Sequence, residues 1–320
     1  MAVTDTAVPD ETLERELAEQ TGAEYRSVRD GLGLDEVLDG ADVVFTNFAT
    51  LGPQELARLA PGAVVVRYGV GVDNVDLAAA ARLGVRVTNV PDYGADVVAD
   101  HAATLAGLAV RRVMTLDRRM RAGEQPIAAE AGRIRSFAAL TVGLVGAGRI
   151  ARLVGRRLAA FGARIVAADP YADAEALAAE GLTLVDVETL LAEADVISLH
   201  APLTDETRHL LDDATLARVR PGVVVVNTAR GGLVDTDALL RALDAGRVAV
   251  AALDVTEPEP LPADHPLRTH PNVVLTPHSA FYAEESMARL QSLAVDEGRR
   301  ALAGEPLRSP VPLPDTGGAR

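Results

Sequence analysis

Short apolar runs rich in valine alternate with amphipathic helical segments along most of the chain. In the first third, three such runs read as strands, and helical segments such as 53–59 and 75–84 lie between them. The strand runs are 41–48, 63–69 and 85–90. Short connections between alternating strands and helices are typical of a parallel sheet that is covered on both faces.

A long helical pattern at 96–121 separates this block from a second one. After a stretch with glycine, proline and few strand-forming residues, to about Phe137, six further strand runs follow. They are 140–146, 164–170, 194–202, 222–229, 248–255 and 272–278. Another long helix is expected at 283–303, and the tail rich in proline and glycine beyond it is expected to be loose. The pattern predicts two doubly wound α/β domains with parallel sheets. The helix near residue 100 leads into the second domain, and the last helix is long enough to return to the first.

Composition limits the classes of partner. The chain has 320 residues, enough for two cores, and a net charge of -15, which argues against nucleic acid and anionic membranes. Its apolar runs are too short to span a bilayer, and its first twenty residues are acidic, unlike a signal peptide. We therefore expect a cytoplasmic protein. Without cysteine, disulfides, thiolate catalysis and cysteine-ligated zinc are excluded.

All 31 basic residues are arginine, and several of them form a basic run at 111–121. The run lies near the end of the long predicted helix, where cations suit the helix dipole. This position favours a solvated or subunit-facing surface over an anion site.

A glycine motif predicts a dinucleotide site of the Rossmann type. Gly146, Gly148 and Ala151 have G-x-G-x-x-A spacing between a strand and a helix. Gly146 permits a tight turn, Gly148 lets the backbone approach a pyrophosphate, and Ala151 lets the helix pack on the strand. The next strand ends in Asp169, which suits a ribose diol and favours NAD over NADP, since no arginine follows it closely. The alternative is that Asp169 only caps the following turn.

Three further strand ends carry reactive side chains. Arg230 follows the valine run 223–226. Asp254 lies at the end of the next strand run, with Glu259 soon after it, and His278 ends the last run. Ligands bind at the carboxyl edge of an open parallel sheet. A guanidinium can grip a carboxylate, and a histidine beside a glutamate can exchange a proton with a carbonyl or hydroxyl oxygen. With a nicotinamide, these groups suit 2-oxo and 2-hydroxy acids. The alternative for Arg230 is a solvated loop residue.

The other histidines lack such companions. His101, on the long helix, is interpreted as a packing residue, His209 as an exposed residue of a helical stretch, and His200 as a strand-end residue near the adenine side. No pair has the helical H-x-x-x-H spacing of a zinc site, so no metal is expected.

At this point the chain resembles the D-isomer-specific 2-hydroxyacid dehydrogenases, from its first residues to about Gly304. The motifs are "RYGVGVDNVD", "NVPDYGADVVADHA", "GLVGAGRIA", "NTARGGLVD", "ALDVTEPEP" and "LTPHSAFY". Within the family, "NVPDYGADVVADHA" and "PHSAFYAEES" are most similar to the C-terminal-binding-protein-like branch. That branch often has tryptophan where this chain has Phe281.

The resemblance implies roles for single residues. Arg230 would bind the substrate carboxylate, Glu259 would pair with His278, and His278 would donate the proton. Asp254 would face the nicotinamide carboxamide. The substrate site would consist of Arg67, Val70, Gly71, Arg230, His278 and Phe281. The NAD(H) site would consist of Gly146, Gly148, Arg149, Ile150, Asp169, Ala201, Pro202, Thr207, Thr228, Ala229, Asp254, His278 and Ala280.

The resemblance also implies domain limits and assembly. A flavodoxin-like substrate domain would cover 1–108 and 285–320, and the Rossmann NAD-binding domain would be inserted at 109–284. Members of the family are homodimers built largely through their cofactor domains, so we expect a homodimer.

Two alternatives to this reading stay open. The chain could be an NAD(H)-sensing, corepressor-like scaffold with little turnover, or a dehydrogenase of a different oxyanion substrate. Arg67 could bind the substrate or pair with a protein carboxylate. The expected substrate is a small 2-oxo or 2-hydroxy acid whose identity the sequence does not give.

Overall fold

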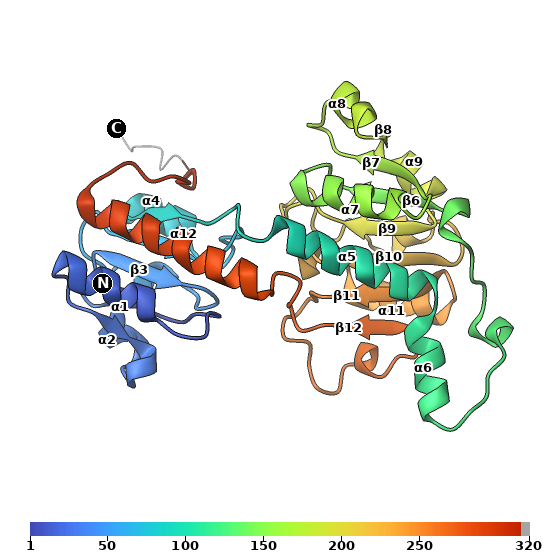
Figure 1. Ribbon diagram of the computed structural model, residues 1–320, viewed down its shortest axis with the longest axis horizontal. Helices are drawn as coiled ribbons and strands as arrows, with labels where there is room; N and C mark the ends of the chain where they lie inside the picture. The colour runs from blue at the N-terminus through green and yellow to red at the C-terminus, as the bar shows by residue number, and fades with distance from the viewer. Residues whose placement is uncertain (315–320) are drawn as a thin grey trace. The chain divides into compact units, whose positions relative to one another are not determined.

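Two parallel β-sheets organise residues 1–314, which are the residues that the computed structural model describes (Figure 1). They lie in two units, Met1–Gly94 with the chain from Tyr282 onward, and Ala95–Phe281. The first unit has a five-stranded sheet in the order β2-β1-β3-β4-β5, with every pairing parallel. Its strands are β1 (Ala2–Val3), β2 (Arg26–Ser27), β3 (Val43–Thr46), β4 (Val64–Arg67) and β5 (Arg86–Thr88).

Helices cover both faces of the first sheet. Side chains of α2 (Leu34–Leu38), α3 (Pro53–Leu56) and α4 (Leu77–Leu83) share one buried apolar cluster with Val44, Val65 and Val87 of the strands. On the other face, α12 (Glu284–Ala303) packs on β3, β4 and α1 (Thr12–Thr21). Gly298 lets α12 come this close, because a Cβ there would lie 2.3 Å from the Phe45 ring.

The second unit has a seven-stranded sheet in the order β12-β11-β10-β9-β6-β7-β8, again parallel throughout. Its strands are β6 (Thr141–Val145), β7 (Arg164–Ala168), β8 (Leu182–Leu184), β9 (Val196–Leu199), β10 (Val223–Asn227), β11 (Val248–Leu253) and β12 (Val273–Leu275). Alternate residues of one strand enter different cores, as Val225 and Val226 of β10 do. Strands buried on both faces read as continuous apolar runs, which is why they could be predicted from sequence.

Each face of the second sheet has its own helices. The helices α5 (Ala95–Val110), α7 (Arg149–Ala159) and α8 (Ala174–Ala179) supply one core, and α5 and α7 are seen over that face in Figure 1. The helices α9 (Val187–Glu193), α10 (Asp213–Leu216) and α11 (Thr236–Asp244) supply the other. Short 3₁₀ helices are η1 (Val28–Asp30), η2 (Ala128–Ala131), η3 (Phe137–Ala139), η4 (Gly231–Leu233) and η5 (Pro266–Arg268). The predicted fold class, two parallel-sheet α/β domains, is confirmed.

The prediction of a single helix over 96–121 is wrong. The helix stops at Val110, and α6 (Val113–Arg121) begins after Arg112, whose φ of 55° lies in the left-handed region. The Arg112 guanidinium turns back and donates a hydrogen bond from Nη1 to the carbonyl of Ala249, at 2.6 Å. No glycine or proline marks this break, so the local pattern gave no signal of it.

The limits of the units differ from those expected at 108 and 285. The first unit ends at Gly94 and resumes at Tyr282, so α5 belongs to the second unit. The reason is packing, because Ala99, Ala102 and Leu105 of α5 are buried in the core that α7 shares. The strands β1 and β2, with two residues each, and β8, with three, were not predicted.

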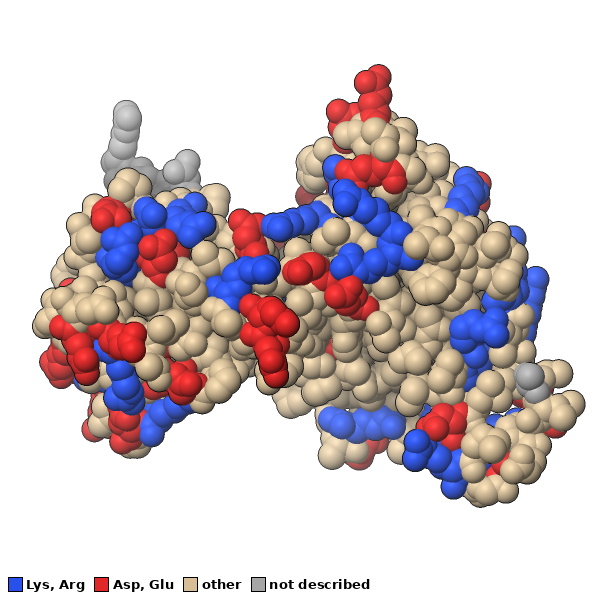
Figure 2. Space-filling view, viewed as in Figure 1, with Lys and Arg blue, Asp and Glu red and all other residues tan. Residues whose placement is uncertain are grey.

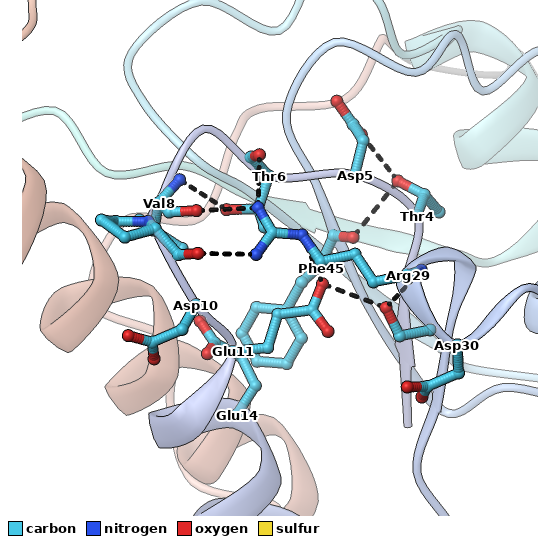
Figure 3. Close-up of polar contacts among 12 residues, drawn as sticks. Thr4, Asp5, Thr6, Val8, Asp10, Glu11, Glu14, Arg29, Asp30 and Phe45 are labelled. Carbon is cyan, nitrogen blue, oxygen red and sulfur yellow. Dashed lines mark hydrogen bonds and ion pairs between the residues drawn. The ribbon is translucent and has the colours of Figure 1, made fainter.

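Polar contacts hold the segment between β1 and α1 (Figure 3). The Arg29 guanidinium donates to the carbonyls of Val8 and Pro9, each at 2.9 Å, and its Nε lies 3.5 Å from the Glu11 carboxylate. Glu11 is 4% exposed and also accepts hydrogen bonds from Tyr25 and Ser27. These partners compensate the burial of the Glu11 charge.

The surface shows no separation of charge on the face in Figure 2, where basic and acidic side chains are interspersed. Across residues 1–314, no helix combines the length and apolarity needed to cross a membrane. The expected homodimer and cellular compartment stay predictions.

Glu14 generates a prediction for the first unit. Its carboxylate is fully buried and accepts hydrogen bonds from the Tyr68 hydroxyl at 2.5 Å and from Gln291 at 2.8 Å. Burial raises the pKa of Glu14 above its ordinary value of 4.5. The folded state therefore holds a proton that the unfolded chain loses, and this part of the stability declines as pH rises from about 4.5 through the raised pKa.

We expect Glu14→Gln to flatten that decline in the free energy of unfolding, measured by urea titration from pH 4.5 to 7.5. Glu16→Gln is the matched control, since Glu16 is exposed on the same helix. An unchanged pH dependence in Glu14→Gln would show that Glu14 does not titrate differently in the fold.

Candidate active site

The glycine turn after β6 requires its first glycine. Gly146 has φ 92°, and a Cβ there would lie 3.0 Å from the His200 carbonyl and the Ala201 nitrogen. The turn after β6 therefore lies directly against the turn after β9. Both turns are at the carboxyl edge of the second sheet, where parallel sheets bind ligands.

Gly148 is different, because a Cβ there would meet no atom within 4 Å. Its φ of -68° suits any residue, so neither packing nor conformation of the chain requires glycine at this position. The open space lies at the amino end of α7, where backbone N–H groups attract a phosphate. Ala151, one turn on, is fully buried, as expected of a small residue in the helix–sheet contact. These features fit a dinucleotide pyrophosphate.

Asp169 has two structural roles. Its carboxylate accepts a hydrogen bond from the Ala147 N–H at 2.8 Å and another from the Tyr171 N–H at 2.9 Å. It therefore caps the following turn, as the alternative reading held, and also ties the glycine turn to β7. Each carboxylate oxygen can accept a further bond, so a ribose diol is still compatible with Asp169.

An arginine does approach this turn from an element that the sequence analysis did not weigh. Arg152 of α7 donates from Nε to the Ala147 carbonyl at 2.9 Å. Its Nη1 pairs with Glu180 at 3.0 Å, and Arg156 pairs with the other Glu180 oxygen at the same distance. The positive charge near the turn is thus shared with a carboxylate.

The turn after β10 presents Arg230. The Asn227 side chain accepts from the Ala229 N–H at 3.0 Å and donates to the Arg230 carbonyl at 2.8 Å, which closes the turn. Arg230 itself is half-buried. The next position, Gly231, requires glycine, because a Cβ there would lie 1.9 Å from the Thr256 carbonyl of the next loop. The Thr228 Oγ1 is buried and has no hydrogen-bond partner among residues 1–314, which suits a polar ligand atom at this point.

Asp254 holds the turn that carries His278. Its carboxylate is 2% exposed and accepts hydrogen bonds from Thr276 Oγ1 at 2.5 Å and from the N–H groups of Ser279 and Ala280, each at 2.9 Å. The His278 N–H donates to the Asp254 carbonyl at 2.8 Å. Asp254 therefore holds His278 in position, a structural role that is separate from any contact with a nicotinamide.

His101 belongs to the same network, so its interpretation as a packing residue is wrong. Its Nε2 lies 3.1 Å from Thr276 Oγ1 and 3.6 Å from the Asp254 carboxylate. The sequence analysis missed this contact because Thr276 lies 175 positions after His101 in the chain. The only clue in the sequence was a polar residue, Thr276, two positions before His278 at the end of the last predicted strand.

His278 and Glu259 form the expected pair. His278 Nδ1 lies 2.5 Å from Glu259 Oε1, and both side chains are partly exposed. The Phe281 ring stands edge-on to the imidazole, with centroids 6.2 Å apart. The two groups can therefore share a proton at the surface of the site, beside an aromatic wall.

A second histidine–glutamate pair lies among the same loops. His209 has φ 52° in a turn, and its Nε2 lies 2.5 Å from Glu257, which also pairs with Arg208 at 2.6 Å. The hydrogen bond from His209, followed by that from Arg208, lowers the pKa of Glu257. The earlier reading of His209 as part of a helix, without companions, is wrong.

His200 is a strand-end residue, as expected. Its Nε2 lies 2.9 Å from Ser198 Oγ, and burial lowers its pKa to about 4. His200 is therefore uncharged near neutral pH.

The remaining residues expected at the site lie as follows. Arg149 and Ile150 open α7, and the Ala280 N–H bonds Asp254. Pro202 and Thr207 lie in the loop after Ala201, where Thr207 Oγ1 donates to the Pro202 carbonyl at 2.6 Å. Arg67, Val70 and Gly71 belong to the first unit, at and after the carboxyl end of β4. Within residues 1–314, no group of three or more His, Asp or Glu side chains could hold a metal ion.

Comparison with known proteins supports this picture. A family model described as "D-isomer specific 2-hydroxyacid dehydrogenase, NAD binding domain" matches residues 103–280. D-3-phosphoglycerate dehydrogenase of Mycobacterium tuberculosis is 41% identical over 280 residues, 86% of this chain and 52% of that protein. Glyoxylate reductase of Korarchaeum cryptofilum is 39% identical over 235 residues, 73% of this chain and 71% of that protein.

A solved structure has the same fold. The NAD-dependent formate dehydrogenase of Staphylococcus aureus, in complex with NAD, aligns with a TM-score of 0.86 and 30% identity over 96% of this chain and 97% of that one. The chain spans about half the length of the phosphoglycerate dehydrogenases that it matches.

The expected cofactor agrees with the matched domain, whose description names NAD. The likeness to the C-terminal-binding-protein-like branch stays a prediction, because these relatives carry other names. From the match over 103–280, the relatives and the shared fold, the chain belongs to the D-isomer specific 2-hydroxyacid dehydrogenase family.

Proposed function

We propose that the chain is an NAD-dependent oxidoreductase that interconverts a 2-oxo acid and a D-2-hydroxy acid. The observation that carries this proposal is the contact of 2.5 Å between His278 Nδ1 and Glu259. The contact lies at the carboxyl edge of the second sheet, where the glycine turn also lies, and this supports an acid–base role for the two residues.

The pair is suited to proton transfer at a substrate oxygen. Because Nδ1 bonds Glu259, we assign proton transfer to Nε2 of His278. During reduction the imidazolium gives a proton to the carbonyl oxygen, and during oxidation the imidazole takes one from the hydroxyl. Glu259 holds the ring orientation and stabilises the imidazolium. Asp254, through Thr276, Ser279 and Ala280, keeps the histidine in place.

The chain's own atoms would hold the cofactor at three points. Gly148 and the amino end of α7 would receive the pyrophosphate, Asp169 the ribose diol, and Thr228 a polar atom at the end of β10. We also assign the backbone around Ala201, Pro202, Ala229 and Ala280 to this site. When bound, NAD(H) supplies or accepts the hydride.

Arg230 would bind the substrate carboxylate. Its turn is fixed by Asn227 on one side and by the close approach of Gly231 to Thr256 on the other. The backbone from which the guanidinium extends is therefore held in one position. A planar fork matches a carboxylate bidentately, which a lysine cannot do. From the first unit, we propose that Arg67, Val70 and Gly71 complete the substrate contacts.

The test of the proposed function is turnover with NADH and a panel of 2-oxo acids, followed by loss of NADH absorbance. The panel contains an acid with an apolar tail and a dicarboxylic acid. It also contains glyoxylate and a phosphate-bearing acid, since relatives are named for glyoxylate and phosphoglycerate. NADH binding without turnover on any member would favour the sensing scaffold instead.

Gly148 gives a prediction for the cofactor site. We expect Gly148→Ala to change the free energy of unfolding by less than about 1 kcal/mol, because its Cβ meets open space. NADH affinity, measured by calorimetry, should fall at least about tenfold, roughly 1.4 kcal/mol, because the methyl group takes the place of the pyrophosphate.

Gly155→Ala is the contrasting variant. A Cβ there would lie 3.3 Å from side chains of Ile165, Leu144 and Leu182, inside the core and away from the glycine turn, so NADH affinity should stay unchanged whatever happens to stability. NADH binding by Gly148→Ala at the original affinity would remove the pyrophosphate from this turn.

The acid–base pair gives a second prediction. His278→Ala should lose most turnover and still bind NADH. Glu259→Gln should move the fall in reduction rate to lower pH, because the imidazolium loses a stabilising negative charge. The measurement is kcat/KM against pH, and an active Gln variant with an unchanged profile would exclude Glu259 from the mechanism.

Arg230 and Phe281 give a third prediction. Arg230→Lys keeps the charge but loses the fork, and should cost about 2–3 kcal/mol in kcat/KM. Phe281 offers an apolar wall beside His278, so the apolar acid of the panel should have the highest kcat/KM, and Phe281→Ala should abolish that preference. A strong preference for a dianionic acid, lost in Arg67→Ala, would make Arg67 the specificity residue.

A further inference from the structure

A cavity of about 260 Å³ lies at the amino edge of the second sheet, opposite the edge that carries His278. Its wall includes the first residues of strands or the residues just before them, namely Leu140 before β6, Asp195 before β9, Val223 of β10 and Val248 of β11. The proposed function does not use this cavity.

Four arginines and one carboxylate line the cavity: Arg112, Arg133, Arg135, Arg220 and Asp195. Arg135 Nη1 lies 2.6 Å from the Asp195 carboxylate, and Arg220 Nη1 lies 3.2 Å from the same oxygen. The other Asp195 oxygen accepts a hydrogen bond from the Thr141 N–H at 3.0 Å. The single negative charge of Asp195 therefore pairs with two positively charged arginines.

The other two arginines face no carboxylate within residues 1–314. Arg112 is half-buried and bonds only the Ala249 carbonyl, and burial lowers its pKa. Arg133 is exposed and forms neither a hydrogen bond nor an ion pair with any residue in the part of the chain that the structure describes. By contrast, Arg119 on the neighbouring α6 pairs with both Glu124 and Glu130.

The cavity thus gathers an excess of three positive charges in a protein whose net charge is -15. Gathering guanidinium groups round one cavity is unfavourable, because like charges repel, unless a counter-charge joins them. We propose that this cavity is a binding site for a compact phosphate-bearing anion. Guanidinium forks match phosphate oxygens, and several arginines can share one phosphate group.

The apolar part of the wall limits the rest of the ligand. Val110, Leu140, Val223, Val224 and Val248 offer no polar side-chain atoms. The wall therefore suits a ligand that carries a few apolar carbon atoms beside its phosphate. The sequence pattern at 111–121 favoured a solvated or subunit-facing surface. The structure instead turns Arg112 into the cavity wall, while its neighbour Arg111 is exposed and is not part of that wall.

The test is calorimetric titration of the whole protein with inorganic phosphate and with pyrophosphate, at constant ionic strength set by sodium chloride. Saturating NADH is present throughout, so that the pyrophosphate site at Gly148 is filled. We expect one binding event, and Arg133→Gln should weaken it at least tenfold. Arg111→Gln is the matched control and should bind as the wild type does.

The variants should not change NADH affinity, because neither residue belongs to the proposed cofactor site. No binding event in the wild type, or equal affinities in Arg133→Gln and the wild type, would overturn the proposal. Sedimentation in the absence of phosphate adds a further check. If Arg133→Glu alters the oligomeric state and the wild type binds no phosphate, the arginines serve a second copy of the chain, and the proposal is wrong.

Discussion

The buried carboxylate of Asp254 holds together the loops on which the proposed chemistry depends. An ionised group that is almost fully removed from water is tolerated only when hydrogen bonds replace its hydration. Here the donors come from Thr276, Ser279 and Ala280, on both sides of His278. The requirement to satisfy Asp254 therefore dictates the course of the chain through the histidine turn, including the positive φ of 50° at His278.

Close backbone contacts between neighbouring loops add to this constraint. Gly231 leaves no space for a side chain against Thr256, and Gly146 leaves little against His200. Each contact joins turns that follow adjacent strands, so the loops after β6, β9, β10 and β11 form one connected edge. Polar contacts complete it, as in the pair of His209 with Glu257. A site of this kind can keep Arg230 and His278 in a fixed relation even though 47 residues, from 231 to 277, separate them in sequence.

Much of this edge was predictable because its signals are local. Strands buried on both faces read as valine runs, and Gly146, Asp169, Arg230 and His278 each follow such a run. What sequence did not reveal depends on distant partners or on single backbone angles. The contact of His101 with Thr276 joins α5 to the loop after β12, and the side chain of Arg112, at the helix break, bonds the distant Ala249. Neither contact changes the periodic pattern of apolar residues from which helices and strands are predicted.

The two contacts that the sequence did not reveal lie at opposite edges of the second sheet, and both involve α5 and β11 or residues next to them. At the amino edge, Arg112, just after α5, bonds Ala249 near the start of β11. At the carboxyl edge, His101 of α5 reaches Thr276 and Asp254, and Asp254 directly follows β11. The helix and the strand are thus pinned to each other at both ends. Any rotation or slide of α5 on the sheet would strain both contacts together, because packed helices move as rigid elements. The position of His278 is therefore linked to the contacts that His101 and Arg112 make, and not only to the residues that surround the imidazole.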